Sequence, residues 1–301
     1  MTTGLRDNSF ARLHSPYVPP RQYFDRYAQG ELPEPHIGEW AQVHDDPETA
    51  ADPNAWRGRM TSAQIGRARA GYYGEISFID AQVGRAMSWM QQHVRRQLAD
   101  TWILFAWDHG DMQGDHNLWR KTYAYEGSAR VPFILVPPRR RGKPDRAVVD
   151  EIVELRDVMP TLLEAAGLPV PHTVDGSSLI PLLTRRADSW RKYIHGEHCR
   201  CYSGEQEMQY ITDGARKFIW LPRTGQEQFF NLEEDPGETC NRIEDPNCAE
   251  EVQQWRSYLV RELKERNCGW VMDGKLDPGD DPLVSPFKDV RWLGARPAQE
   301  E

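Results

Sequence analysis

Apolar side chains recur at spacings of three and four residues over a long stretch that begins near Ser62. The members of this series are Ile65, Ala68, Tyr72, Ile76, Ile79, Val83, Met87, Met90 and Val94. This spacing predicts one amphipathic α-helix of unusual length, capped at its start by Thr61 or Ser62. Residues 1–60 are rich in Pro, Tyr and Trp without periodicity, and they predict ordered loop with a short helix near Pro20–Tyr27.

Two short, continuous apolar runs follow the long helix, at Thr101–Trp107 and Val131–Val136. Such runs are typical of strands that are covered on both faces of a sheet. Helical spacing returns between Ile152 and Ala166 and is stopped by Gly-Leu-Pro. The order of helix, strand, loop, strand and helix predicts an α/β architecture for residues 1–185.

The texture of the sequence changes after residue 185. Gln209–Asp213 and Lys217–Leu221 flank Gly214 and predict a β-hairpin, to which Gln228–Leu232 adds a third strand. Ala249–Arg266 predicts a polar-rich helix with one apolar face, and the last thirty residues predict an extended tail. We therefore expect residues 186–301 to form a smaller α+β subdomain, with a short antiparallel sheet, a helix and the tail.

Charge and hydropathy exclude two classes of protein. The chain has 301 residues and a net charge of −9, and its charges are spread out apart from the run Arg139-Arg140-Arg141. A nucleic-acid-binding protein needs a basic face, so no nucleic-acid partner is expected. No segment reaches the roughly 20 apolar residues of a membrane span, so no membrane partner is expected. The N-terminal residues lack an apolar signal core, which favours a cytoplasmic location.

The cysteines do not form a disulfide framework. There are five, and no pair has C-x-x-C spacing. Cys199-x-Cys201 lies near His195 and His198 and suggests a zinc site, but thiolates two residues apart are poorly placed for tetrahedral coordination. Reduced thiols in a cytoplasmic protein are the better interpretation.

The candidate chemistry lies where the first apolar run ends. Asp108 and His109 follow TWILFAW directly, at the strand end where ligands of α/β sheets gather. A carboxylate and an imidazole suit a divalent cation, although Asp108 can equally cap the turn beside a solvated His109. A lysine near a metal indicates an anion between them, and Lys121 follows in the same loop. Asp115-His116 repeats the pair without a preceding strand, so we expect a supporting role.

These residues resemble a known family, the type I sulfatases. The resemblance rests on DHGDMQGDHNLWRKTYAYEGSARVP, in which a strand ends in Asp-His-Gly and a Lys precedes Tyr-x-Glu-Gly. Upstream, SFARLHSPYVPPRQYFDRY and RARAGYYGEISFIDAQVGR are similar to family segments, although Leu13 replaces a usual proline. Downstream, RDVMPTLLEAAGLPVPHTVDGSSLIPLL, HGEH and ITDGARKFIWLPRTGQEQFFNLEEDPGE continue the match in family order.

The resemblance implies a fold and a role for each matching residue. Residues 1–185 would be the later part of a sulfatase catalytic domain, with part of an alkaline-phosphatase-like sheet flanked by helices. Asp108 and His109 would be two ligands of a divalent metal, usually calcium. Lys121 would contact the sulfate and neutralise the leaving oxygen, and His14 would also reach the ester and protonate the departing alcohol. His195 and His198 can line the substrate pocket or serve as structural histidines.

The family nucleophile does not occur in this sequence. Sulfatases use a formylglycine made from Cys/Ser-x-Pro-x-Arg, and no Cys or Ser here fits that pattern. Asp45-Asp46 is no substitute for the family's opening metal pair, because no buried strand precedes it. We expect the chain to correspond to the later part of a sulfatase, with an exposed sheet edge and an incomplete metal site. Either an upstream, nucleophile-bearing polypeptide completes that site, or the chain is a truncated reading frame, a remnant, or a gene model begun at the wrong Met.

The expected function is hydrolysis of a sulfate ester of a small molecule or saccharide. Two alternatives stay open at this point. One is a phosphonate monoester or phosphodiester hydrolase of the same superfamily, which shares Asp-His-Gly. The other is a non-catalytic, anion-binding remnant.

Overall fold

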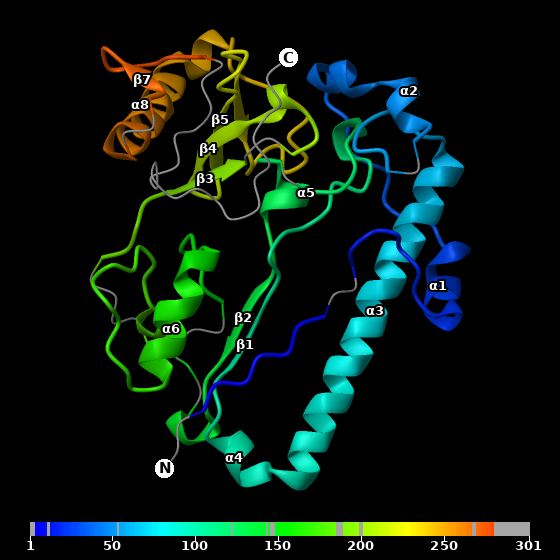
Figure 1. Ribbon diagram of the computed structural model, residues 1–301, viewed down its shortest axis with the longest axis vertical. Coiled ribbons are helices and arrows are strands. Elements are labelled where there is room, and N and C mark those ends of the chain that lie inside the picture. The colour runs from blue at the N-terminus through cyan, green and yellow to red at the C-terminus, as the bar shows by residue number, and fades with distance from the viewer. Residues whose placement is uncertain are drawn as a thin grey trace, which may run out of the picture.

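The computed structural model describes residues 4–10, 13–52, 54–121, 123–142, 144, 148–184, 189–198, 201–266 and 269–279. The long helix α3 and the paired strands β1 and β2 form two arms that the short helix α4 joins at one end (Figure 1). A C-terminal sheet with its helix α8 lies at the opposite end of these arms (Figure 1). Within the residues described, no helix has the length and hydropathy needed to span a membrane.

Helix α3 confirms the long amphipathic helix, since it runs over Ser62–His93. The predicted cap is Thr61, whose hydroxyl accepts the Gln64 N–H at 3.3 Å while the Gln64 side chain accepts the Thr61 N–H at 2.9 Å. This reciprocal pair is a capping box. Helix α1 (Arg21–Ala28), also expected, packs on α3 through the edge-to-face rings of Tyr23 and Phe78.

Several one-turn elements connect the larger ones. They are η1 (Glu39–His44), α2 (Pro47–Ala50), α4 (Arg95–Ala99), η2 (Asp115–Asn117), α5 (Glu126–Ala129), η3 (Arg139–Arg141), α7 (Ile180–Leu183), η5 (Gly204–Gln206) and η6 (Pro246–Cys248). Asp46 caps α2 by accepting the Glu48 and Thr49 N–H groups, and it also binds Arg57 at 2.7 Å. These contacts give Asp46 a structural role, in line with its rejection as part of a metal pair.

Strands β1 (Ile103–Ala106) and β2 (Phe133–Val136) form an antiparallel pair. The two apolar runs are strands as predicted, but the expectation that both faces are covered is wrong for β2. Ile134 and Val136 are 52% and 44% exposed, because alternate side chains of β2 point away from the described part of the chain. The expected exposure of apolar sheet surface is therefore present here.

Helix α6 (Val158–Ala165) is shorter than the stretch predicted from Ile152. A 3-10 turn, η4 (Leu155–Asp157), precedes it. The buried Asp157 carboxylate accepts the Glu154 and Ser177 N–H groups and pairs with Arg191 at 2.6 Å. These bonds hold Asp157 at the start of the helix.

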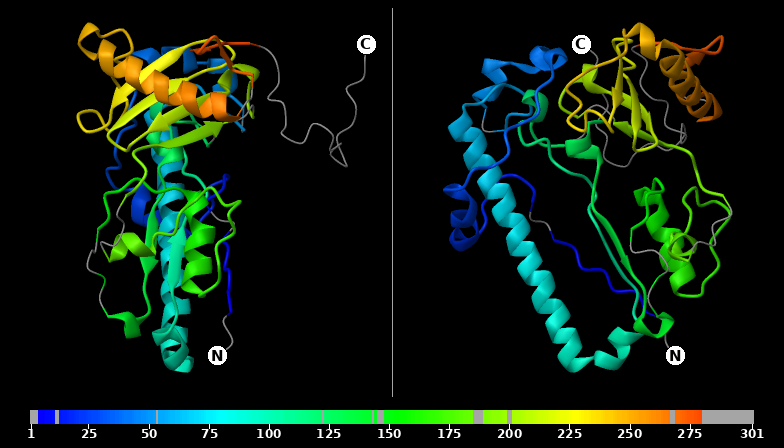
Figure 2. Two further views of the ribbon diagram at one scale, coloured as in Figure 1. Left: turned by 90° about the vertical axis from the view of Figure 1, so that its left-hand side faces the viewer. Right: turned by 180° about the vertical axis from the view of Figure 1, so that it is seen from behind.

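The C-terminal subdomain is a four-stranded antiparallel sheet in the order β3-β4-β5-β6, covered by α8 (Ala249–Arg266). Its strands are β3 (Ile194–His198), β4 (Met208–Thr212), β5 (Arg216–Trp220) and β6 (Glu227–Asn231). Figure 2 shows α8 lying across one face of the sheet. The predicted hairpin, third strand and helix are confirmed, whereas β3 was missed.

Two clusters of buried side chains fill the two faces of this sheet. The loop-side core comprises Met112, Leu118, Tyr123, Ala124, Tyr125, Met208, Ile219, Phe230 and Leu232. The helix-side core comprises Ile211, Phe218, Trp220, Phe229, Val252, Trp255, Leu259, Leu263 and Trp270. The loop-side core joins the sheet to the loop between β1 and β2, so the chemistry-bearing loop is part of the packed interior.

The expected extended tail is wrong at its start. Strands β7 (Val271–Met272) and β8 (Lys275–Leu276) pair as a small hairpin. Residues 280–301, where the rest of that tail was expected, lie outside the described residues.

Candidate active site

The Asp-His-Gly turn lies directly after β1. The His109 Nδ1 lies 2.8 Å from the Gly110 carbonyl, which can only accept, so Nδ1 carries a proton. The other nitrogen, Nε2, lies 3.5 Å from the Asp108 Oδ2. A neutral His109 ring would therefore place the lone pair of Nε2 beside the Asp108 carboxylate. Either a proton or a metal cation between these two groups would stabilise the arrangement. A histidine that donates to a backbone carbonyl while its second nitrogen faces outward is common among metal ligands.

This pair fits a metal site only in part. Asp108 also accepts the His109 N–H at 3.0 Å, so it caps the turn as the alternative interpretation expected. The Asp108 side chain is 85% exposed and that of His109 is 38% exposed, which leaves both accessible. In the described part of the chain, no three His, Cys, Asp or Glu side chains gather as a metal site would require. Calcium takes six to eight oxygen ligands, so Asp108 and His109 supply a fraction of such a shell.

Helix α5 packs tightly against this turn. The Gly110 N–H donates to the Ser128 carbonyl at 2.8 Å. A Cβ atom on Gly110 would lie only 2.2 Å from the Gly127 carbonyl oxygen, so a larger residue would push α5 away. Glycine is therefore required at position 110 for close approach, and α5 fixes the position of the turn.

Asp111 is the centre of hydrogen bonding in the loop. Its Oδ2 accepts the Tyr17 hydroxyl at 2.6 Å, and its Oδ1 accepts the Gln113 and Arg120 N–H groups. Burial and the nearby Asp111 carboxylate raise the pKa of Tyr17, which keeps the phenol protonated as a donor. Asp111 thus fastens the His14 segment, through Tyr17, to the loop of Asp108.

Glu75 holds the same segment from helix α3. It is fully buried, and its two carboxylate oxygens accept the N–H groups of Leu13 at 3.1 Å and Val18 at 2.9 Å. His14 is exposed between these two anchors, and its Nδ1 lies 2.8 Å from the Ser15 carbonyl. This contact leaves Nε2 as the nitrogen available to a ligand.

Lys121 lies half-buried in the same loop. The preceding Arg120 donates from its guanidinium to the Ala55 carbonyl at 3.2 Å and to the Asn54 side chain at 3.1 Å. Residues Tyr123 and Tyr125, just after Lys121, are buried in the loop-side core. Asp108, His109 and Lys121 thus belong to the loop between β1 and β2, and the Tyr17–Asp111 hydrogen bond joins the His14 segment to that loop.

The two C-terminal histidines lie on opposite faces of the sheet. His195 is opposite Ile211 of the helix-side core, and its Nε2 lies 2.8 Å from the Gln209 side-chain oxygen. His198 is opposite Met208 of the loop-side core, and its ring lies 6.3 Å from that of Tyr123. Side chains on opposite faces of a sheet do not share a pocket. These two histidines therefore cannot both line the surface near Lys121.

His198 is the histidine on the side of the Lys121 loop. It is 8% exposed, and burial lowers its pKa to about 4, so the ring is neutral near pH 7. Its Nε2 has no hydrogen-bond partner among the described residues. Cys199 of the suggested zinc site lies outside the described residues, and Cys201 is exposed.

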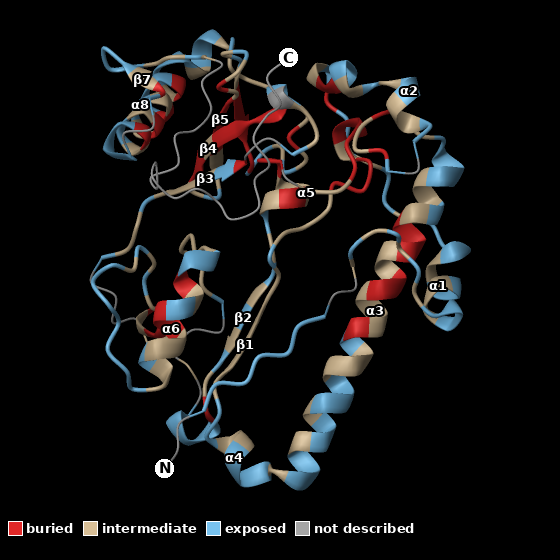
Figure 3. Cartoon of the chain, viewed as in Figure 1, coloured by how far each residue is buried: buried red, intermediate tan, exposed pale blue. Residues whose placement is uncertain are grey.

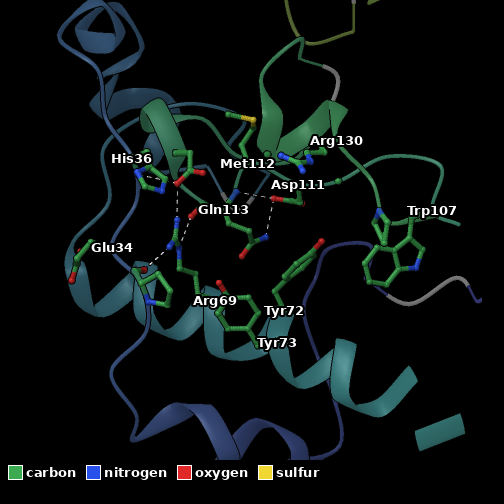
Figure 4. Close-up of a pocket in the computed structure, with 15 residues that line it drawn as sticks. Glu34, His36, Arg69, Tyr72, Tyr73, Trp107, Asp111, Met112, Gln113 and Arg130 are labelled. Atoms are coloured by element: carbon green, nitrogen blue, oxygen red, sulfur yellow. Dashed lines mark hydrogen bonds and ion pairs between the residues drawn. The ribbon is translucent and has the colours of Figure 1, made fainter. Parts of the chain in front are cut away.

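A cavity of about 290 Å³ lies between α3 and the loop of residues 107–115 (Figure 4). Arg69 on its wall is 5% exposed and donates to the Gln113 carbonyl at 3.0 Å and to Asp115 at 2.8 Å. Figure 4 shows the Gln113 amide directed between Arg69 and Tyr72. The six residues predicted from the sequence do not line this cavity.

Asp115 and His116 have the supporting role expected of them. Asp115 accepts from Arg69 and from the His36 N–H at 3.0 Å. The His116 ring lies 4.5 Å from the Trp40 ring and 5.3 Å from the Tyr125 ring. Both side chains therefore brace the loop from inside.

The sequence reasoning missed the residues that hold the site together. Glu75 and Arg69 are charged residues beside the apolar face of a predicted helix. This position was the signal in the sequence that could have identified them. Their partners lie 36 to 62 residues away, so the pairings could not be read from local spacing.

Comparisons with known proteins show the family of this chain. The Sulfatase family model matches residues 8–168, and the model "N-sulphoglucosamine sulphohydrolase, C-terminal" matches residues 114–266. The chain is 43% identical over 285 residues to an arylsulfatase of Clostridium perfringens, covering 94% of this chain and 58% of that protein. It is 31% identical over 295 residues to a choline-sulfatase of Rhizobium meliloti, covering 95% and 53%.

A solved structure supports the fold. The phosphonate monoester hydrolase of Silicibacter pomeroyi superposes with a TM-score of 0.71 at 25% identity, covering 84% of this chain and 54% of that chain. This chain spans about half the length of the curated relatives it matches. The α/β fold with a small C-terminal sheet and helix is thereby confirmed, and the chain belongs to the type I sulfatases of the alkaline phosphatase superfamily.

Proposed function

We propose that this chain contributes to the hydrolysis of sulfate esters, with Asp108, His109, Lys121 and His14 at the reacting group. One observation carries the proposal. Tyr17 ties the His14 segment to the loop that bears Asp108 and Lys121, since its hydroxyl donates to Asp111 at 2.6 Å, while Glu75 of α3 holds the same segment by accepting the Val18 N–H at 2.9 Å. Residues far apart in sequence thus belong to one hydrogen-bonded system, as a shared site requires.

Each residue has a role that its chemistry allows. Asp108 and His109 would hold a divalent cation, for which we propose calcium, and a bound cation would neutralise negative charge on the sulfate oxygens. The Lys121 ammonium would neutralise charge that develops on the leaving oxygen. His14 would donate a proton from Nε2 to the departing alcohol while its Nδ1 stays on the Ser15 carbonyl.

The nucleophile would come from a polypeptide segment that this sequence does not include. The present sequence contains no Cys/Ser-x-Pro-x-Arg. We therefore propose a nucleophile-bearing polypeptide as partner, which would also supply the remaining metal ligands. A cytoplasmic location stays a prediction.

The relatives support a substrate class. Proteins named arylsulfatase and choline-sulfatase share 43% and 31% identity with this chain, which supports a sulfate ester of a small molecule. A sulfated saccharide belongs to the same class. The match to a phosphonate monoester hydrolase favours that reaction as a second candidate. A non-catalytic anion-binding protein is the third.

Calorimetric titration with sulfate in the presence of calcium tests the site. Lys121→Ala should weaken sulfate binding about tenfold, because one ion pair to a bound anion is worth on the order of 1–2 kcal/mol. The matched control is Lys192→Ala, since Lys192 is an exposed lysine outside this loop. Equal sulfate affinity in wild type and Lys121→Ala would refute the assignment.

Turnover separates the candidate reactions. An aryl sulfate and an aryl phosphodiester would be compared with the chain alone and with the chain plus a nucleophile-bearing half from a relative. We expect hydrolysis of the sulfate in the second case. Preference for the diester would establish the phosphonate-hydrolase alternative, and binding without turnover in the completed protein would establish the non-catalytic one.

A further inference from the structure

Lys217 is a buried lysine that lies outside the proposed site. It is 0% exposed in strand β5, on the face of the loop-side core. Its ammonium donates to three oxygens, each at 2.8 Å: the Ala124 carbonyl, Glu126 Oε1 and Glu238 Oε1. A buried ammonium persists only when it is fully paired, so these three contacts act together.

The charge of this group is secured by its partners. Burial by itself would lower the pKa of Lys217, but the carboxylates of Glu238 and Glu126 outweigh burial and raise it. Glu238 is 2% exposed, and its Oε2 accepts the Glu126 N–H at 2.7 Å. Lys217 and Glu238 thus hold the first residue of α5 by its side chain and by its backbone.

The contacts continue from α5 to the Asp-His-Gly turn. The carbonyl of Ser128 in α5 accepts the Gly110 N–H at 2.8 Å, and Gly127 packs directly on Gly110. On the other side, the Ala124 carbonyl belongs to the segment that follows Lys121. A single ammonium in the C-terminal sheet therefore contacts the segment that follows Lys121, and this segment continues into the helix that packs on the Asp108 turn.

A second contact from the same sheet acts in parallel. The Tyr125 hydroxyl donates to the Gln228 side chain of β6 at 2.9 Å. This neutral bond fixes one ring, whereas the Lys217 contacts fix a backbone carbonyl, a side chain and, through Glu238, an N–H group. The ammonium and its partner Glu238 thus hold three polar groups of the loop, which belong to Ala124 and Glu126.

We propose that Lys217 is a positioning residue, through which the C-terminal sheet sets the positions of Lys121 and of the Asp108-His109 turn. The part that concerns sulfate rests on the proposed function. The part that concerns the loop rests on the contacts of Lys217. An experiment can therefore separate the two.

The test compares two buried ion pairs of the C-terminal subdomain in the full chain. Lys217→Met with Glu238→Gln removes the donor to the loop and leaves no new unpaired charge at those two positions. Arg223→Met with Glu207→Gln is the matched control, because Arg223 and Glu207 are 5% and 2% exposed and pair at 2.6 Å. The measurements are the midpoint of unfolding, amide hydrogen exchange over residues 108–128, and sulfate affinity by calorimetry with calcium present.

We expect exchange over residues 108–128 to rise about tenfold in the Lys217 double variant, and sulfate affinity to fall by a similar factor. The control should leave both within about twofold, even where it lowers the midpoint of unfolding. If the Lys217 double variant does not fold, Glu126→Ala replaces it. Glu126→Ala keeps the Lys217–Glu238 pair and removes the contact between Lys217 and the Glu126 side chain, which is 21% exposed.

The outcomes decide between positioning and simple stability. Unchanged exchange over residues 108–128 in the folded variant would overturn the proposal, and so would an equal rise in the control. Faster exchange over residues 108–128 in the Lys217 double variant would support the positioning of the loop. If the wild-type chain binds no sulfate, the proposed function is refuted while the positioning of the loop stands. A lower affinity without faster exchange would also overturn it, because the loop would then be in place.

Discussion

The C-terminal sheet and the two arms of the molecule bury their apolar side chains to very different extents (Figure 3). Strands β5 and β6 have four buried residues each, and α8 buries one full face. The second half of α3, from Asp80 to His93, has no buried residue, and Trp89 there is 55% exposed. Strand β2 exposes Ile134 and Val136 in the same way.

The difference shows what supports the proposed site. The loop with Asp108 and Lys121 connects β1 to the partly exposed strand β2, yet its central residues lie in the loop-side core of the C-terminal sheet. Its position is therefore determined chiefly by the well-packed region.

The largest expected effect tests the packing of the two regions. Phe218→Ala should lower the free energy of unfolding by about 3–5 kcal/mol, because it opens a cavity in the helix-side core. Phe218 is 0% exposed. The control Trp89→Ala on the open arm should change it by less than about 0.5 kcal/mol. Chemical denaturation followed by circular dichroism measures both, and similar losses would show that the arm is packed as well as the sheet.

An intermediate effect concerns pH at the junction of the regions. Burial lowers the pKa of His116 from 6.5 to about 3, so the unfolded chain binds a proton at this residue more readily. The contribution of His116 to the free energy of unfolding should therefore be fully present above pH 6.5. It should fall by about 1.4 kcal/mol per pH unit as the pH decreases from 6.5 toward 3. Asparagine tolerates the left-handed backbone conformation of residue 116, so His116→Asn should keep the local backbone. It should reduce the dependence of the free energy of unfolding on pH.

The measurement is the denaturation midpoint between pH 7.5 and 5.0, over which the wild type should lose about 2 kcal/mol from this group. His93→Asn, an exposed histidine on the arm, is the control and should keep the wild-type slope. A His116→Asn slope equal to that of the wild type would contradict the prediction.

The smallest effect concerns the anchor of the His14 segment. Glu75→Gln places an amide NH₂ against a backbone N–H, either that of Leu13 or that of Val18, and should cost about 1–2 kcal/mol. Amide exchange of residues 13–18 should rise with it. Asp80→Asn on the same helix is exposed and should have no effect on either quantity. Unchanged exchange in Glu75→Gln would show that the segment is held by other contacts.

Local patterns predicted the elements that local forces specify. The spacing of apolar residues located α3 and α8, and the apolar runs located β1 and β2. Strand β3 was missed because Ile194–His198 contains two histidines, a glutamate and a glycine. Glycine stands at position 196 because a Cβ would meet the Tyr210 ring of the neighbouring strand at 2.1 Å. This contact depends on the tertiary structure and is not visible in the local sequence.

For the candidate site, the sequence supplied Asp108, His109, Lys121 and His14, together with the family. The contacts that hold the His14 segment against α3 and the loop come from Glu75, Asp111 and Tyr17 and cross 57 to 94 residues. The sequence also grouped His195 with His198, whereas strand pairing places them on opposite faces. Side chains alternate along a strand, and this alternation could be applied only once β3 was known to be a strand.

The amino-acid sequence by itself determined the family and the helix of the long arm, and it supplied the candidate site residues, because each depends on neighbours along the chain. Only the tertiary structure decided that Lys217 belongs with Ala124 and Glu126, and that Ile134 and Val136 of β2 remain exposed among the described residues. The physical reason is that burial and charge pairing depend on which distant segments meet. Spacing along the sequence does not contain that information.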